Sequence, residues 1–276
     1  VFPLTDREIS SLFGLMVLRL CTSACVAAHQ RRQNPDNDYL DFSQAAIRRT
    51  VPALERIPFR LAEAVFRDAC GLEAVPASPR VSAWLGAHTA HFASVLDVDL
   101  RSEPCTVLDL GIGSSLSSGD PSENTEPPLT RRIAEVLRAS GTHIGIGRYD
   151  EARLLYMAPA FASGTSPDEE RRMIHIGLDL FAGAGTPVFA PLDGTVHAFA
   201  RNPAPQDYGH VIVLRHATDD GVVFFTLYGH LSRESLAGVA VGQSVARGER
   251  IATLGAPDAN GGWTPHLHLQ IITDDL

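Results

Sequence analysis

The sequence carries histidines and an aspartate at spacings that could hold a metal ion. His175 and Asp179 are the first and last residues of "HIGLD", and Gly177 between them, with "AGAGTPV" just downstream, argues against a helix. On an extended segment, residues four apart lie on the same face, so the imidazole and the carboxylate can point the same way. His266 and His268 alternate with leucines in "HLHLQ". On a strand, this alternation places both imidazoles on one face.

These residue types suit a catalytic zinc site. Catalytic zinc typically has three His or carboxylate ligands and an open fourth position, whereas structural zinc has four closed ligands. The His175/Asp179 pair, beside the two strand histidines, can close around one divalent ion. A further histidine, His230, ends an apolar strand in "LYGHL". The order H-x3-D, Y-G-H-L, P-H-L-H in one stretch predicts a metal site suited to hydrolysis by an activated water.

The sequence after residue 142, which must position these residues, has the pattern of an antiparallel β domain. Short β-rich runs follow residue 142, and Gly, Pro and Asp-Gly pairs separate them at hairpin-like intervals. We therefore predict a mainly β C-terminal domain at 142–276. The runs include "TPVFAPLDGTVHAFA", "HVIVLRH", "VVFFTLYGHL", "RIATLG" and "HLHLQIIT".

The N-terminal part is predicted to be α-helical. Thr5 and Glu8 have the spacing of a capping box ahead of an apolar run with helical periodicity. Further helices are expected at 42–57 and 59–70. We interpret residues 1–72 as one helical segment and 73–141 as a mixed connecting region. That region has expected helices at 79–87 and 130–140 and an apolar strand in "CTVLDL".

Composition narrows the classes of function. The chain has 276 residues, 45% of them hydrophobic, and a net charge of -9, which argues against nucleic-acid binding. The four cysteines are interpreted as free thiols in a reducing compartment. No basic-then-apolar leader and no apolar run of membrane-spanning length is evident, so we expect a cytoplasmic protein without a membrane partner. Because the sequence starts at Val1 rather than Met, we interpret it as a fragment.

At the metal motifs the sequence resembles the lysostaphin-type zinc metallopeptidases, a family of peptidoglycan endopeptidases. The resemblance covers about residues 145–273. It includes "GLDLFAGAGTPVFAPLDGTV" after the first ligand and "GVAVGQSVARGERIATLG" before the last motif. The resemblance implies an antiparallel β sandwich of the duplicated hybrid motif kind, with the metal at the floor of a groove across one sheet.

The resemblance also assigns roles to individual residues. It implies that His175, Asp179 and His268 hold one Zn²⁺ per chain and that His230 and His266 are catalytic without being ligands. One histidine would take the proton of the attacking water and the other would hydrogen-bond the oxyanion. The sequence departs from the family at Leu269-Gln270, where Phe-Glu is common; this pair lies beyond the ligands.

A second resemblance concerns the N-terminal part. "SLFGLMVLRLCTSACVAAHQRRQNPDNDYLDFS" looks like the final helices of aminoglycoside-phosphotransferase-like kinases, although no catalytic-loop Asp or D-F-G element is recognisable. The arrangement resembles bacterial fusion proteins in which such a kinase, a lysostaphin-type domain and a class III aminotransferase follow one another. It implies flanking kinase-like and aminotransferase domains in the full-length protein.

Two flanking segments have more than one interpretation. "DANGGWTPHLH" is either a loop that turns the chain before the ligand strand or a groove wall in which Trp263 stacks on substrate. "GRYDEARLLYM", at 147–157, could fold over the groove and block the metal. "GIGSSLSSG" lacks the Lys-Ser/Thr ending of a phosphate-binding loop, so that function is set aside.

Three functions remain open at this point. The first is zinc-dependent hydrolysis of a peptide or amide bond, in a Gly-rich or D-amino-acid-containing peptide of the peptidoglycan type. The second is a non-catalytic metal- or ligand-binding scaffold module within a multi-enzyme fusion. The third is hydrolysis of a soluble amide metabolite. The presence of both non-ligand histidines favours catalysis, whereas a cytoplasmic location favours the scaffold.

Overall fold

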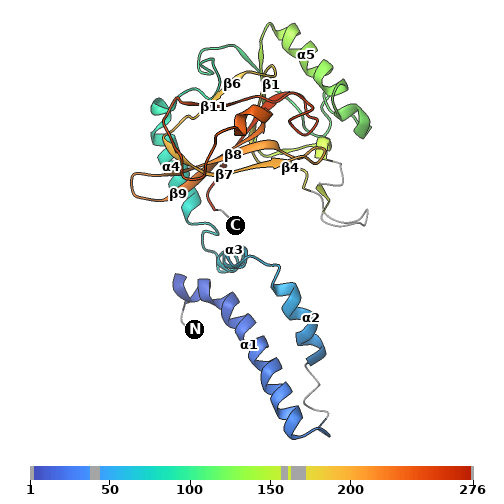
Figure 1. Cartoon of the computed structure of the whole chain (residues 1–276), viewed down its shortest axis with the longest axis vertical. Coiled ribbons are helices and arrows are strands. Elements are labelled where there is room, and N and C mark those ends of the chain that lie inside the picture. Colours follow the sequence, from blue (N-terminus) through green and yellow to red (C-terminus); the bar gives the residue numbers. More distant parts are fainter. Residues whose placement is uncertain (1–2, 38–43, 157–160, 163–171, 275–276) are drawn as a thin grey trace. The chain divides into compact units, whose positions relative to one another are not determined.

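The protein consists of two compact units. The computed structural model describes residues 3–37, 44–156, 161–162 and 172–274. The first unit comprises Val1–Ser78 with Asp274–Leu276, and the second comprises Pro79–Thr273. Figure 1 shows the helical first unit and the strand-rich second unit. The three-part division predicted from the sequence stays a prediction.

The first unit is helical, as predicted. Its helices are α1 (Asp6–Gln33), α2 (Gln44–Leu54) and α3 (Phe59–Ala69). The capping box forms: the Glu8 amide donates to Thr5 Oγ1 at 3.3 Å, and the Thr5 amide donates to Glu8 Oε2 at 2.8 Å. Phe13 on α1 packs edge-on against Phe59 on α3, with ring centroids 5.1 Å apart. Residues 42–43 of the helix predicted at 42–57 lie outside the described residues.

Helix α1 corrects one expectation from the sequence. Among the described residues it is the helix that is long and apolar enough to cross a membrane, judged by length and composition alone. Its apolar window has a mean hydropathy of 1.8, and 11% of that window is buried within the structure. The prediction that no apolar run reaches this length is therefore wrong.

The second unit is built on an eight-stranded sheet in the order β1-β2-β5-β12-β9-β8-β7-β10. Neighbouring strands are antiparallel except for the parallel pair β1 and β2, so the sheet is mixed but mainly antiparallel. The strands are β1 (Cys105–Leu108), β2 (Ile144–Gly147), β5 (Leu178–Phe181), β7 (Gly194–Asn202), β8 (Gly209–Ala217), β9 (Val223–Leu231), β10 (Ser244–Val245) and β12 (His266–Ile272). A mainly β C-terminal region after a helical N-terminus is confirmed.

Two short ribbons complete the strands of this unit. β6 (Pro187–Phe189) pairs with β11 (Arg250–Thr253), and β3 (Glu151–Ala152) pairs with β4 (Ile174–His175). Both pairs are antiparallel. The β3–β4 ribbon matters for function because β4 ends on His175, one of the predicted ligands.

Two apolar clusters hold the second unit together. The larger lies between the main sheet and the β6–β11 ribbon and includes Leu214, Tyr228 and Val188, each fully buried. In the smaller, Leu129 and Ile133 of α5 (Pro128–Ser140) pack with Leu108 and Phe181. Among the described residues, the structure also has α4 (Ala77–Ala87) and the 3₁₀ helices η2 (Thr89–His91), η3 (Pro121–Asn124), η4 (Leu154–Tyr156) and η6 (Arg233–Leu236).

Candidate metal centre and active site

The three predicted ligands meet at the centre of the main sheet. Strand β12 pairs with β5 in a register that places His268 directly opposite Asp179. His175 reaches the same point from the end of β4. Gly177, between β4 and β5, makes this approach possible, because a Cβ there would lie 2.5 Å from His268 Cε1. Gly177, which argued against a helix in the sequence, therefore also provides space for the third ligand.

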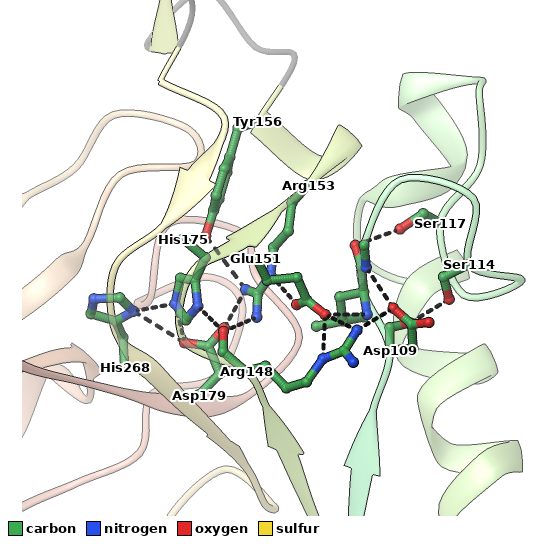
Figure 2. A network of polar contacts seen from close by, with 12 residues as sticks. Asp109, Ser114, Ser117, Arg148, Glu151, Arg153, Tyr156, His175, Asp179 and His268 are labelled. Atoms are coloured by element: carbon green, nitrogen blue, oxygen red, sulfur yellow. Dashed lines mark hydrogen bonds and ion pairs between the residues drawn. The ribbon is translucent and has the colours of Figure 1, made fainter.

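The three candidate ligand atoms lie slightly closer to one another than they would around a zinc ion. His175 Nε2 lies 3.1 Å from Asp179 Oδ1 and 3.1 Å from His268 Nδ1, and the latter two atoms are 3.0 Å apart. Ligand atoms about 2.0–2.1 Å from a tetrahedral zinc ion lie roughly 3.3–3.4 Å from one another. All three side chains are buried. Small adjustments would thus accommodate the ion, and Figure 2 shows the three groups pointing toward one another.

The proton positions on the histidines also fit a metal. His175 Nδ1 donates to the Arg148 carbonyl at 2.7 Å, so a neutral His175 presents the lone pair of Nε2 to the centre. His268 Nε2 lies 3.5 Å from Gln270 Oε1, a separation at the limit of a hydrogen bond that leaves Nδ1 as the inward atom. Two nitrogen lone pairs and a carboxylate oxygen then face one another. These electron-rich atoms repel one another, and a cation bound between them would attract all three.

Gln270 is closer to the ligands than the sequence suggested. The departure from the family at Leu269-Gln270 was interpreted as lying beyond the ligands, whereas the Gln270 amide oxygen is next to the outer nitrogen of His268. A partner on the outer nitrogen fixes the ring orientation of a ligand histidine. In this chain that partner is the neutral amide of Gln270.

The Asp179 carboxylate is ionised. Burial by itself would raise its pKa, but the surrounding histidines and the Arg153 guanidinium outweigh this effect and hold the pKa well below its usual value. Arg153 Nη1 donates to Asp179 Oδ2 at 2.5 Å. The carboxylate therefore keeps the negative charge that a ligand of a divalent cation needs.

The two predicted non-ligand histidines lie together beside the metal centre. The ring centroids of His230 and His266 are 4.3 Å apart, and His266 Nε2 is 3.6 Å from Asp179 Oδ1. His230 Nδ1 donates to the Asn260 carbonyl at 2.9 Å, and His266 Nδ1 donates to the Thr264 carbonyl at 2.6 Å. Each neutral ring is thereby left with an unprotonated Nε2 that can accept a proton.

Burial favours the neutral form of both rings. It lowers the pKa of His266 to about 4, and burial together with the neighbouring His266 holds the pKa of His230 well below its usual value. His230 also adopts a left-handed backbone conformation with φ 65°, which is uncommon for a residue with a side chain. Its amide donates to the Tyr208 carbonyl at 2.9 Å, next to the irregularity in the pairing of β9 with β8.

Trp263 lies in a loop that hydrogen bonds hold in place. Its indole Nε1 donates to the Asp207 carbonyl at 3.1 Å, and its amide donates to Asn260 Oδ1 at 2.9 Å. The ring lies edge-on to His230, with centroids 5.9 Å apart. Trp263 therefore serves the structural role expected for the loop and also lines the pocket; stacking on substrate stays a prediction.

The metal centre opens into a pocket of about 340 Å³. Its wall includes all five of the predicted metal and catalytic residues. The wall also includes residues that precede β4 in the sequence, namely Arg153, Leu155, Tyr156, Phe161 and Arg172. The described part of the 147–157 segment thus reaches the pocket, in line with the interpretation that it folds toward the groove. Whether it blocks the metal stays a hypothesis.

Sequence reasoning missed the charged residues that surround the ligands. Glu151 accepts from Arg153 Nε at 2.8 Å and from Arg148 Nε at 2.9 Å, and Arg148 also pairs with Asp109 at 2.6 Å. The signal was present in "RYDEAR", in which Glu151 and Arg153 are two residues apart and share a strand face. Without the pairing of β3 with β4, nothing connected that face to the ligands.

Part of the chain is similar to known proteins. Residues 173–275 match the family model described as "Peptidase family M23". The chain is 35% identical over 127 residues to an uncharacterized metalloprotease of Haemophilus influenzae, covering 46% of this chain and 24% of that protein. It is 33% identical over 102 residues to the peptidoglycan DD-endopeptidase ShyC of Vibrio cholerae, covering 37% and 21% respectively. The chain thus spans about a quarter or less of the length of these relatives.

Two solved structures are also similar to less than half of this chain. The catalytic domain of lysostaphin from Staphylococcus simulans is 29% identical, with 42% of this chain and 80% of that chain covered and a TM-score of 0.32. A zinc-containing peptidase from Vibrio cholerae is 32% identical, with 40% and 31% covered and a TM-score of 0.31. The family resemblance seen at about 145–273 is confirmed over 173–275. The resemblance of the N-terminal helices to a kinase stays a prediction.

Proposed function

We propose that the peptidase M23 domain of this chain is a zinc-dependent endopeptidase that hydrolyses an amide bond in a peptidoglycan-type peptide. The observation that carries the proposal is the convergence of two histidine lone pairs and one carboxylate oxygen within 3.0–3.1 Å of one another in a buried centre. The relatives that are peptidoglycan DD-endopeptidases support the choice of substrate class.

The proposed chemistry divides between the metal and the protein. A zinc ion held by His175, Asp179 and His268 would supply Lewis acidity toward a carbonyl oxygen and would activate a water. His230 and His266 both present an unprotonated Nε2 toward the pocket. Either ring can accept the proton of the attacking water and later deliver it to the leaving amine.

The tautomers constrain the role of the second histidine. Because Nδ1 of each ring is committed to a backbone carbonyl, a neutral ring has no hydrogen on Nε2 to donate. A hydrogen bond from His230 or His266 to an oxyanion therefore requires prior protonation of that ring. The histidine that hydrogen-bonds the oxyanion must therefore be protonated, whereas the histidine that takes the proton of the water must be neutral.

The first experiment measures metal content in protein purified without chelator, with His268→Ala as the test variant and His143→Ala as the control. His143 is an exposed histidine outside the site. One zinc per chain in the parent and the control, lost in His268→Ala, supports the metal centre. Hydrolysis of peptidoglycan-derived peptides by the zinc-loaded parent then supports the activity. Absence of zinc after incubation with the ion would refute the proposal.

The alternative is a non-catalytic binding module. One observation favours it: residues upstream of β4, including Arg153 and Tyr156, already form part of the pocket wall. A site that binds zinc in the expected ratio yet hydrolyses none of the peptides or soluble amides tested would support this alternative.

Four finer predictions belong to the same proposal. A β sandwich of the duplicated hybrid motif kind is proposed from the family resemblance. Flanking kinase-like and aminotransferase domains are proposed from the N-terminal resemblance. A cytoplasmic location and the absence of a membrane partner are proposed from the sequence, and a fractionation experiment on the full-length protein would test both, given the apolar character of α1.

A further inference from the structure

Arg153 places a buried guanidinium directly on a proposed metal ligand (Figure 2). Its side chain is 3% exposed. One end of the guanidinium donates to Asp179 Oδ2 at 2.5 Å, and Nε donates to Glu151 Oε2 at 2.8 Å. Burying charged groups is costly unless they are well paired, so this geometry indicates a fixed position between two carboxylates.

The two oxygens of Asp179 have different partners. Oδ1 faces the nitrogens of His175 and His268 at 3.1 and 3.0 Å, whereas Oδ2 accepts from Arg153. A carboxylate with both oxygens free can bind a metal through one of them or through both. With Oδ2 committed to the guanidinium, one oxygen is left for the ion.

The backbone around Arg153 is fixed to the ligand strand. Glu151 pairs with His175 in the β3–β4 ribbon, and the Arg153 amide donates to the Met173 carbonyl at 2.9 Å. On the outer side, the Arg148 guanidinium donates to Glu151 Oε1 at 2.7 Å. Arg148, Glu151 and Arg153 all precede residue 173, the first residue of the family match. The ribbon therefore brings a charged network from outside the matched domain to the ligands.

We propose that Arg153 is a positioning residue that restricts Asp179 to a single metal-binding oxygen and so preserves the open coordination position. This inference rests on the proposed function, because it assumes that the three ligands hold a metal. A second oxygen from Asp179 would add a ligand atom where a catalytic site needs room for water and substrate.

The test compares the visible absorption of Co²⁺ bound to the full chain and to three variants. Visible absorption of Co²⁺ is strong for four-coordinate ions and less strong for five-coordinate ions, so the spectrum reports the number of ligand atoms without an activity assay. Arg153→Met removes the partner of Oδ2. Arg148→Met is the matched control, because it removes an equal charge one step outward and keeps the backbone carbonyl that accepts from His175. Arg153→Lys keeps the charge but lacks the guanidinium fork.

The expected result is strong absorption in the parent and in Arg148→Met, and a clear decrease in absorption in Arg153→Met. Arg153→Lys should lie between them, since a single ammonium cannot replace the fork that spans Glu151 and Asp179. We also expect peptide hydrolysis by zinc-loaded Arg153→Met to fall about 10–100-fold. Circular dichroism of each variant reports folding, and if Arg153→Met is unfolded the Arg153→Lys spectrum decides.

Three outcomes would overturn one proposal or the other. Parent-like absorption in folded Arg153→Met, or in Arg153→Lys when the methionine variant is unfolded, refutes the positioning role and leaves the metal centre intact. An equal loss in Arg148→Met also refutes it, because the effect would then belong to the charge network as a whole. Failure of the parent to bind Co²⁺ or Zn²⁺ refutes the proposed function itself.

Discussion

Gly177→Ala is expected to weaken metal binding although it changes neither a ligand nor a charge. The added Cβ would lie 2.5 Å from His268 Cε1, 2.8 Å from His268 Nε2 and 3.0 Å from the Leu269 carbonyl oxygen. Ordinary contact with a Cβ begins at 3.4 Å, so the His268 ring must move by roughly 0.9 Å to remove the first of these overlaps. Metal–ligand distances tolerate about 0.2 Å, so a shift of this size disrupts the centre.

The expected loss of zinc affinity can be estimated from the effect of disturbing the support of a metal ligand. A loss of about 10–100-fold in zinc affinity is typical when the support of a ligand is disturbed. That corresponds to roughly 1.4–2.7 kcal/mol of binding free energy. Competition with a chromogenic zinc chelator measures the affinity, and thermal unfolding with and without zinc gives an independent value.

Gly183→Ala is the matched control for this prediction. Gly183 follows β5 a few residues later, and a Cβ there meets no atom within 4 Å. Parent-like zinc affinity is therefore expected for Gly183→Ala. Parent-like affinity in Gly177→Ala would refute the reasoning, because His268 would then be free to bind the ion from another position.

Three further predictions test separate parts of the molecule. His230→Ala should retain zinc and lose about 10²–10⁴-fold in hydrolysis, and metal analysis beside a peptide assay checks both; loss of zinc would contradict its non-ligand role. Burial lowers the pKa of His216 below its usual value of 6.5. Between these two pH values, His216 is protonated in the unfolded chain but not in the folded chain. The free energy of unfolding should therefore fall as the pH drops from about 6.5 toward the lowered pKa. Urea unfolding across that range should show a flatter profile in His216→Gln, and identical profiles would refute the assignment. Thr5→Ala should cost about 1 kcal/mol of stability in the helical unit by removing the capping box, as measured by the loss of helical circular dichroism with temperature.

The sequence indicates which candidate site residues can point the same way, because short spacings on strands determine which residues share a face. His266 and His268 are two apart, and His175 and Asp179 are four apart, so each pair could be oriented before any pairing of strands was known. The capping box of α1 is local in the same way. These features depend on residues that are close in the chain.

The features that the sequence did not predict depend on distant pairings. The role of Arg153 follows from the pairing of β3 with β4, and that of Gly177 follows from the antiparallel register of β12 with β5. Strand β1 joins the main sheet in parallel with β2, although its residues had been interpreted as part of a connecting region. Periodicity does not specify which strands become neighbours, so these contacts required the structure.

The three candidate ligands lie on strands with unequal support, and this has a kinetic consequence. Asp179 and His268 lie on β5 and β12, each of which has a neighbour on both sides in the main sheet. His175 instead lies on a two-residue strand in a two-stranded ribbon. Backbone amides of β5 and β12 are expected to exchange hydrogen slowly and those of β4 quickly, because small ribbons open locally at low free energy. Release of the ion should then follow the opening of β3 and β4 and proceed much faster than unfolding of the domain.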